Sequence, residues 1–141
     1  NQLYAASYQG SVVAIDVQSG RKLWQEDAST FSGVSQGLGN IYVAEEDGTI
    51  NAYLRDGQGL NWTQGALSNR QLSRPTPVGS YVAVADFEGY VHVLSQEDGE
   101  FVGRVRADDE GARADMASVD NILYVYGNSG EMVAYEITAG D

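Results

Sequence analysis

A pattern of glycines and apolar residues recurs about every forty residues in this sequence and limits the folds open to it. Four glycines align at spacings of 38, 41 and 41 residues, namely Gly10, Gly48, Gly89 and Gly130. Seven residues before each glycine stands an apolar residue, in turn Leu3, Ile41, Val82 and Leu123. Four and five residues after it stand two more, in turn Ala14 and Ile15, Ala52 and Tyr53, Val93 and Leu94, and Ala134 and Tyr135. Since neighbouring strand residues point to opposite faces, these apolar pairs indicate strands buried on both faces.

Each repeat divides into short strand candidates. In the second repeat we expect strands at 31–36, 41–45, 49–54 and 61–64, separated by turns at 37–40, 47–48 and 56–59 that contain Gly, Asn or Asp. No segment keeps an apolar period of 3.6 residues long enough for an ordinary helix. Repeats of this length with four short strands are typical of propeller blades, which stack radially because a single blade cannot bury both of its faces.

The sequence therefore predicts an all-β fold, a partial β-propeller of four-stranded antiparallel blades. We expect one domain over residues 1–141, with repeats at about 1–30, 31–69, 70–110 and 111–141 that hold three, four, four and three strands. This is roughly half of a larger ring. Open strand edges and uncovered blade faces are expected to favour self-association of the chain.

Composition excludes several classes of protein. The chain has 20 Asp and Glu against 8 Lys and Arg, a net charge of -12, which excludes a nucleic-acid-binding surface of the usual basic kind. It has no Cys, which excludes a disulfide framework, a zinc ribbon and a thiol nucleophile in this sequence. Its apolar runs are much shorter than the roughly 18 residues of a membrane-spanning helix.

The most specific motif is Ala-Ile-Asp-Val-Gln-Ser-Gly-Arg-Lys-Leu-Trp, which contains Ala14, Asp16, Gly20 and Trp24. The Asp and the Ser-Gly pair indicate a tight turn between the third and fourth strands of a blade. The Trp then places a large ring between blades, where its N–H can find an acceptor. We interpret Trp24 and Trp62 as packing residues between blades and not as ligand contacts. This segment resembles the tryptophan-docking motif of the PQQ-like propeller repeat.

A closer resemblance covers essentially the whole chain. The segments 41–45, 72–78 and 86–102, and Gly103 in place of a docking Trp, are similar to the C-terminal half of the BamB family. The resemblance implies an eight-bladed, non-catalytic scaffold subunit of the bacterial outer-membrane β-barrel assembly (BAM) complex. That subunit is lipid-anchored at the periplasmic face of the outer membrane, binds the periplasmic POTRA domains of BamA and assists outer-membrane protein folding and insertion. Unfolded outer-membrane proteins are further expected partners. A signal peptide and a lipid-bearing Cys would belong to a preceding part.

The candidate partner-binding residues lie in the loops that enter the first strand of each blade. These loops, at 29–32, 67–74 and 108–113, are expected to open on one face of the ring. The best local candidates are Arg70, Gln71, Leu72 and Arg74, because interfaces are centred on Arg and apolar residues and this segment places two cations around a Leu. The alternative is that the two arginines only neutralise neighbouring carboxylates.

PQQ-like repeats also occur in quinoprotein dehydrogenases, which carry a vicinal disulfide, a calcium site and a carboxylate base. A chain without Cys does not fit that pattern. His92, the single histidine, is expected to be a packed or solvent-facing strand residue. The carboxylates at 45–47 and 108–110 lack EF-hand spacing and are expected to be solvated turn charge. We therefore predict no catalytic, cofactor-binding or metal-binding residue and no cofactor.

Two alternative functions remain open. A periplasmic propeller that binds glycans or the cell wall would use exposed aromatic residues, with Tyr8, Phe87 and Tyr90 as candidates. A fragment of a PQQ-dependent dehydrogenase would take up its cofactor only in the complete ring. Glycan binding without BamA binding would reveal the first alternative, and quinone absorbance of the complete protein would reveal the second.

Overall fold

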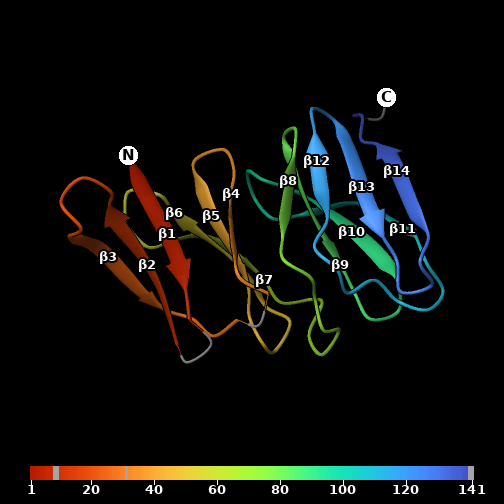
Figure 1. Ribbon diagram of the computed structural model, residues 1–141, viewed down its shortest axis with the longest axis horizontal. Coiled ribbons are helices and arrows are strands. Elements are labelled where there is room, and N and C mark those ends of the chain that lie inside the picture. The colour runs from red at the N-terminus through yellow and green to blue at the C-terminus, as the bar shows by residue number, and fades with distance from the viewer. Residues whose placement is uncertain (8–9, 31, 140–141) are drawn as a thin grey trace.

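A computed structural model describes residues 1–7, 10–30 and 32–139 of the chain. Over these residues fourteen strands form four antiparallel sheets that follow one another along the chain (Figure 1). The first sheet contains β1 (Gln2–Ala6), β2 (Ser11–Asp16) and β3 (Lys22–Asp27). The second contains β4 (Val34–Gln36), β5 (Asn40–Ala44), β6 (Ile50–Leu54) and β7 (Leu60–Gln64).

The third sheet contains β8 (Thr76–Val78), β9 (Tyr81–Ala85), β10 (Tyr90–Ser95) and β11 (Phe101–Arg106). The fourth contains β12 (Ala117–Val119), β13 (Ile122–Tyr126) and β14 (Met132–Glu136). In each sheet the strands lie side by side in chain order. The predicted all-β fold and the predicted three, four, four and three strands are confirmed. Among the described residues, none belongs to a helix that could span a membrane.

The strand boundaries differ from the prediction mainly at the first strand of the second sheet. The sequence predicts a strand over 31–36, whereas β4 begins at Val34. The amides of Ser32 and Gly33 donate to the hydroxyl of Thr30, so this stretch forms a turn before the strand. Phe31 itself lies outside the described residues.

The sheets are arranged like the blades of a propeller. Strand β8 contacts β4 on one side and β12 on the other, so the first strands of three successive sheets lie next to one another. The later strands of each sheet extend away from this line of contacts (Figure 1). Each of the two middle sheets therefore turns one face to the preceding sheet and the other face to the following sheet.

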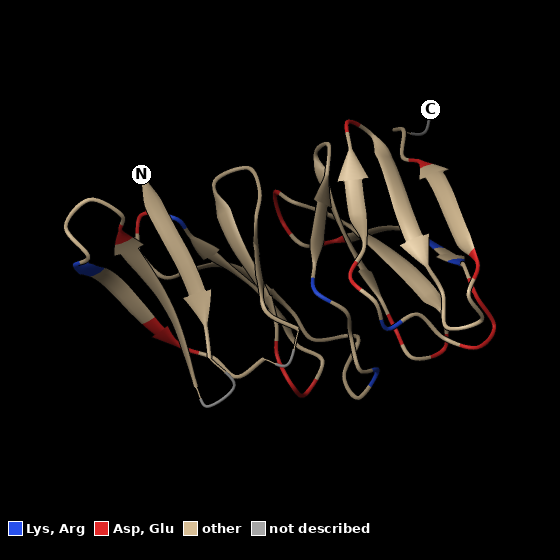
Figure 2. Cartoon of the chain, viewed as in Figure 1, with Lys and Arg blue, Asp and Glu red and all other residues tan. Residues whose placement is uncertain are grey.

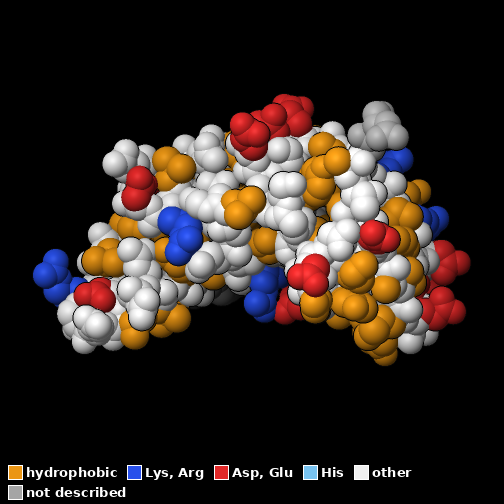
Figure 3. Space-filling model, turned by 90° about the horizontal axis from the view of Figure 1, so that it is seen from above, with side chains coloured by type: hydrophobic (Ala, Val, Ile, Leu, Met, Phe, Trp, Pro, Cys, Tyr) orange, Lys and Arg blue, Asp and Glu red, His pale blue; other side chains and the backbone are white. Residues whose placement is uncertain are grey.

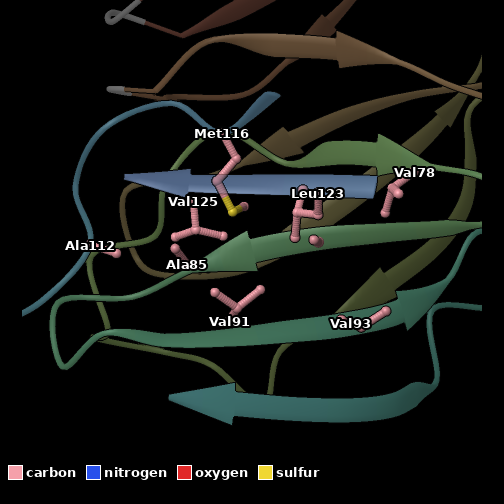
Figure 4. Packing of buried hydrophobic residues seen from close by; sticks show 9 residues of the cluster. Val78, Ala85, Val91, Val93, Ala112, Met116, Leu123 and Val125 are labelled. Carbon is pink, nitrogen blue, oxygen red and sulfur yellow. The ribbon is translucent and has the colours of Figure 1, made fainter. Parts of the chain in front are cut away.

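Apolar side chains fill the spaces between the sheets. On β5, Ile41 and Val43 pack with Val12 of the first sheet, whereas Tyr42 packs with residues of the third sheet. All five residues of β5 are buried, as the paired apolar columns predict. Between the third and fourth sheets, side chains of β13 point toward those of β9 and β10 (Figure 4).

The two outermost faces of the stack are not covered. On β13, Leu123 and Val125 are buried, but Tyr126 is 49% exposed and Met132 on β14 is 66% exposed. Hydrophobic side chains accordingly gather on the surface at the end of the molecule that holds the fourth sheet (Figure 3). Leu3 of the first sheet is also exposed. Within the described residues, burial on both faces is thus confined to the middle sheets.

The repeating glycines have a packing role. Gly48 and Gly89 occupy the turns between the second and third strands of their sheets, with φ of 91° and 87°. A Cβ at Gly48 would collide with the Leu67 carbonyl, and one at Gly89 with the Asp108 carbonyl. Each carbonyl belongs to the loop that leaves the same sheet for the next one. The glycine spacing therefore reflects a close crossing of two backbone segments in these sheets.

Candidate functional site

The loops that connect successive sheets lie at one end of the strands, beside the turns between the second and third strands. A backbone hydrogen bond of the same kind ties each loop to a turn of the sheet that the loop enters. The three bonds are Glu46 N–H to Ser29 O, Phe87 N–H to Arg70 O, and Asn128 N–H to Gly111 O, at 3.0, 3.0 and 2.9 Å. This end of the molecule is therefore a set of short, mutually bonded loops.

A cleft with a volume of about 920 Å³ opens among these loops. We call it the loop cleft. Its wall comes from loops and turns of the second, third and fourth sheets. It contains the cations Arg74 and Arg113, the carboxylates Glu45, Glu46, Glu110 and Asp115, and the apolar residues Ala44, Leu72, Phe87 and Ala112. Acidic residues are concentrated in the turns and loops of the molecule (Figure 2), so the loop cleft lies in a largely acidic environment.

Arg74 connects three loops at the loop cleft. Its Nη2 lies 2.6 Å from Oδ2 of Asp115, and its Nε donates to the carbonyl of Ser32 at 3.1 Å. Arg74 therefore joins the entry loops of the second, third and fourth sheets. Both members of the ion pair stay substantially exposed, with 44% and 54% of their side-chain surfaces accessible.

Arg70 lies on the other side of the same loop and does not line the loop cleft. Its Nη1 is 3.0 Å from Oδ2 of Asp86, a completely buried carboxylate. Nε2 of His92 lies 2.8 Å from the same oxygen. Both arginines of the 70–74 segment thus pair with carboxylates, as the alternative interpretation of this segment expects. His92 is a packed strand residue that is 3% exposed.

The environment of Asp86 favours its ionised form. Burial by itself would raise the pKa of this carboxyl. Hydrogen bonds from His92, from the Tyr90 amide and from Arg70 outweigh burial and lower the pKa. The Asp86 carboxylate consequently holds together the third-sheet entry loop, a turn and β10.

Gln71 and Leu72 line the loop cleft together with Arg74. Gln71 has a φ of 53° and is exposed, and Leu72 packs partly against the core between the second and third sheets. The four candidate partner-binding residues are therefore divided, with three at the loop cleft and Arg70 directed into the third sheet.

The expectation of solvated turn charge is wrong for Asp108. This residue is only 7% exposed and accepts hydrogen bonds from the Ser129 hydroxyl, the Ser129 amide and the Glu110 amide. These bonds, led by that of the Ser129 hydroxyl, lower the pKa of Asp108. Asp108 therefore fastens the loop that leaves the third sheet to a turn of the fourth sheet. Over the described ranges, no group of acidic or histidine side chains has the arrangement of a metal site.

Glu45 also differs from a freely solvated turn residue. It is partly buried at the loop cleft. Burial, with a further contribution from the charge of Asp47, raises the pKa of Glu45. The loop cleft thus contains a carboxyl whose ionisation is less favourable than usual.

The two tryptophans lie between sheets. Trp24 donates its indole N–H to the Arg55 carbonyl at 3.0 Å, and Trp62 donates to the Gln96 carbonyl at 2.9 Å. In each case the acceptor lies in the last turn of the following sheet. A glycine in the same turn makes room for each ring. A Cβ at Gly57 would collide with the Trp24 ring, and a Cβ at Gly99 with the Trp62 ring.

Small residues opposite the tryptophans make room for the rings. Ala14 and Ala52 pair across the sheet with Trp24 and Trp62, and both alanines are fully buried. Before Trp24, the Asp16 carboxylate accepts from the Ser19 hydroxyl at 2.8 Å, and Gly20 has a φ of 73°, which forms the predicted turn. In the third sheet the larger residue of the pair, Val93, stands at the position of the alanines, and Gly103 stands at the position of the tryptophans.

Sequence reasoning did not identify Gln96 as an important residue. Its Oε1 accepts from the Tyr42 hydroxyl at 2.7 Å and from the Leu38 amide at 3.0 Å. Its Nε2 donates to the carbonyls of Gly79 and Tyr81. Gln96 thus joins the second and third sheets through a buried polar network. Nothing in the local sequence indicates this, because its partners lie more than fifteen residues away except for Tyr81.

The stacked antiparallel sheets of three and four strands and the docked tryptophans define a segment of a β-propeller with PQQ-like repeats. Comparison with known proteins agrees. A family model described as "Outer membrane protein assembly factor BamB" matches residues 1–64. The outer membrane protein assembly factor BamB of Pseudomonas aeruginosa is 50% identical over 135 residues, which are 96% of this chain and 36% of that protein.

The crystal structure of BamB from Moraxella catarrhalis aligns with a TM-score of 0.90 at 25% identity, over 99% of this chain and 42% of that chain. The chain belongs to the BamB family. It spans about a third of the length of the curated relatives that it matches. A quinohemoprotein alcohol dehydrogenase from Comamonas testosteroni aligns at 19% identity with a TM-score of 0.66, over 88% of this chain and 27% of that chain, and so shares the fold alone.

Proposed function

We propose that this chain is part of a non-catalytic scaffold subunit of the BAM complex and that it binds the periplasmic POTRA domains of BamA. The proposed location is the periplasmic face of the outer membrane, in a lipid-anchored parent protein. Unfolded outer-membrane proteins are proposed as further partners. Membership of a family named for outer-membrane protein assembly supports this proposal.

The observation that carries the proposal is the loop cleft. Loops of three successive sheets are fastened to one another there by Arg74 and Asp108, so the surface is held in a defined shape. Phe87, with 47% of its surface exposed, lines the loop cleft together with Leu72 and Arg74. An aromatic ring and an Arg around an apolar patch are the residue types that dominate protein interfaces.

A binding titration tests the proposal. The purified periplasmic domain of BamA is titrated against the full-length parent and against this chain, each with and without Phe87→Ala. We expect the substitution to weaken binding by about tenfold or more, since an interfacial aromatic anchor typically contributes over 1 kcal/mol. The matched control is Leu38→Ala, because Leu38 is 67% exposed but lies in the β4–β5 turn at the opposite end of the strands.

The outcomes separate the parts of the proposal. Equal affinities of Phe87→Ala and Leu38→Ala proteins would refute the loop cleft as the contact. Binding by the parent but not by this chain would place the main contact in the remainder of the parent. A folded parent that does not bind BamA would refute the scaffold function.

The exposed ring of Phe87 also favours a second candidate, binding of glycans. Aromatic rings that are accessible at a cleft stack on apolar sugar faces. Of the other two candidates, Tyr90 is covered by the guanidinium groups of Arg104 and Arg106, and Tyr8 lies outside the described residues. Titration with soluble cell-wall glycan fragments, in the absence of BamA binding, would favour this function. The third interpretation, a fragment of a PQQ-dependent dehydrogenase, would require quinone absorbance in the purified parent.

A further inference from the structure

A second cavity, separate from the loop cleft, lies between the second and third sheets. Its volume is about 420 Å³, and no residue that lines it also lines the loop cleft. One wall is the segment after β7, with Leu67 and Arg70. The other wall is formed by β10 and β11, with His92, Phe101 and Arg104. We call it the inter-sheet pocket.

Strand register places a cation beside the histidine. His92 on β10 pairs directly with Arg104 on β11, and Tyr90 pairs with Arg106 two residues further along. The guanidinium carbon of Arg104 lies 4.7 Å from the centre of the Tyr90 ring, which orders the side chain through a cation–π contact. In the part of the chain that the structure describes, no carboxylate forms an ion pair with Arg104.

The charges around the inter-sheet pocket are unusual for this protein. The chain carries a net charge of -12, yet two arginines, Arg70 and Arg104, line this pocket. The carboxylate next to them, Asp86, already accepts hydrogen bonds from Arg70, from His92 and from the amides of Glu88 and Tyr90. Asp86 therefore has little remaining capacity to neutralise a further cation, and Arg104 is available to an external anion.

An apolar surface adjoins the cations. Phe101 is 40% exposed, and its ring meets the His92 ring edge to face with 6.2 Å between centres. Leu67 on the opposite wall is buried. Gly103 also lines this wall and contributes no side chain. A ligand in the inter-sheet pocket would therefore meet a guanidinium group next to an aromatic ring.

We propose that the inter-sheet pocket binds carboxylate groups that are attached to an aromatic or other apolar body. The carboxylate accepts hydrogen bonds from Arg104, whose planar guanidinium matches its geometry, and the apolar body lies against Phe101. The carboxylate comes from a free small acid or from an acidic side chain within a peptide. The chemistry of the two sources is the same, and the experiment distinguishes them.

The experiment uses nuclear magnetic resonance of the 141-residue chain. Benzoate is the free-acid probe, and acetyl-Phe-Glu-Phe-amide is the peptide probe, whose single carboxylate lies on a side chain. We expect saturable shifts of the side-chain resonances of Arg104, Phe101 and His92. Benzylamine, which carries the opposite charge on the same ring, is expected to leave these resonances unchanged.

Variants test the residue that carries the proposal. We expect Arg104→Gln to weaken benzoate binding by about tenfold, the effect of losing one charge-assisted contact. Arg113→Gln removes the same charge at the loop cleft and is the matched control. A spectrum with unchanged dispersion shows that each variant is folded.

Each outcome decides for or against the pocket. The proposal is supported if Arg104→Gln weakens benzoate binding and Arg113→Gln leaves it intact. The natural carboxylate is then a free acid if the peptide does not bind, and an acidic side chain of a peptide if the peptide binds at least as well as benzoate. Equal weakening by both substitutions, equal shifts with benzylamine, or no saturable shift with either acid would overturn it. Because Arg104 lies outside the loop cleft, the BamA titration is independent of this result.

Discussion

Replacement of Trp62 by alanine tests whether the docked tryptophan holds the second and third sheets together. The indole is 8% exposed, lies over the Gly99 turn, packs near Tyr42 with ring centres 5.8 Å apart and donates to the Gln96 carbonyl. Its removal creates a cavity between the two sheets and takes away the apolar surface that the indole buries.

The expected magnitude follows from this burial. A buried Trp replaced by Ala costs about 3–5 kcal/mol, against a total free energy of unfolding of about 5–15 kcal/mol for a domain. For a chain of this size that is a fall in Tm of roughly 10–20 °C. Trp62→Phe keeps much of the aromatic surface but loses the hydrogen bond from the indole N–H to the Gln96 carbonyl. About 1 kcal/mol of the stability lost in this variant comes from that hydrogen bond. The loss for Trp24→Ala should be smaller than for Trp62→Ala, since Trp24 is only partly buried.

Urea denaturation followed by far-ultraviolet circular dichroism measures these losses without relying on tryptophan fluorescence. A double-mutant cycle with Gly99→Ala sharpens the test, because a Cβ at Gly99 would collide with the Trp62 ring. In the Trp62→Ala background, Gly99→Ala should cost only the backbone strain of its φ of 76°, about 1–2 kcal/mol. In the original protein it should cost clearly more.

Two results would refute the reasoning. One is a loss below about 1 kcal/mol for Trp62→Ala, which would mean that the ring contributes little to the contact between sheets. The other is additivity of the two substitutions within about 0.5 kcal/mol, which would mean that Trp62 and Gly99 do not interact.

Three further predictions concern other parts of the chain. The folded protein lowers the pKa of Asp86, so its carboxylate stabilises the fold fully at pH values above the ordinary pKa of about 3.9 and loses this effect as the pH falls through the lower pKa of the folded state. Asp86→Asn should therefore reduce stability at pH 7 and flatten the acid side of a plot of urea midpoint against pH. An unchanged plot would contradict this. Gly89→Ala should lower Tm far more than Gly103→Ala, because only the first Cβ would collide with backbone; similar Tm values would refute the crossing argument. The exposed face with Tyr126 and Met132 should make the chain self-associate at high concentration, less so when both are changed to Lys, and a monomeric light-scattering profile at all concentrations would argue against it.

The local elements of the fold are largely predictable from the sequence. The apolar pairs around the glycines indicate strands buried on both faces, and β5 has this burial at every position. The Asp16 and Gly20 turn also follows from the sequence, since its hydrogen bonds join residues within five positions of one another. In both cases the physical cause, period or turn geometry, acts over a few residues.

The contacts between repeats are less predictable. The charged residues at 108–110 look like solvated turn charge, but Asp108 is buried, and Ser129, twenty-one positions later, supplies two of the three hydrogen bonds to its carboxylate. Gln96 likewise becomes a buried connection only because Tyr42 and Leu38 of the preceding sheet reach it. No local pattern contains this information.

The candidate sites show the same division. The sequence places Arg70 and Arg74 in one loop with two possible roles. The structure directs Arg70 to Asp86 in the third sheet and Arg74 to Asp115 at the loop cleft. Side chains four residues apart on an irregular loop have no fixed relative direction, so only the neighbouring sheets determine where each one points.

The repeat, the strands and the turns of this protein follow from its amino-acid sequence, because period and turn chemistry depend on neighbours along the chain. The packed fold alone shows which sheet faces are covered, which charges are paired and where cavities remain. Those properties depend on how one repeat packs against the next, and the inter-sheet pocket beside Arg104 exists only where the segment after β7 comes to lie against β10 and β11.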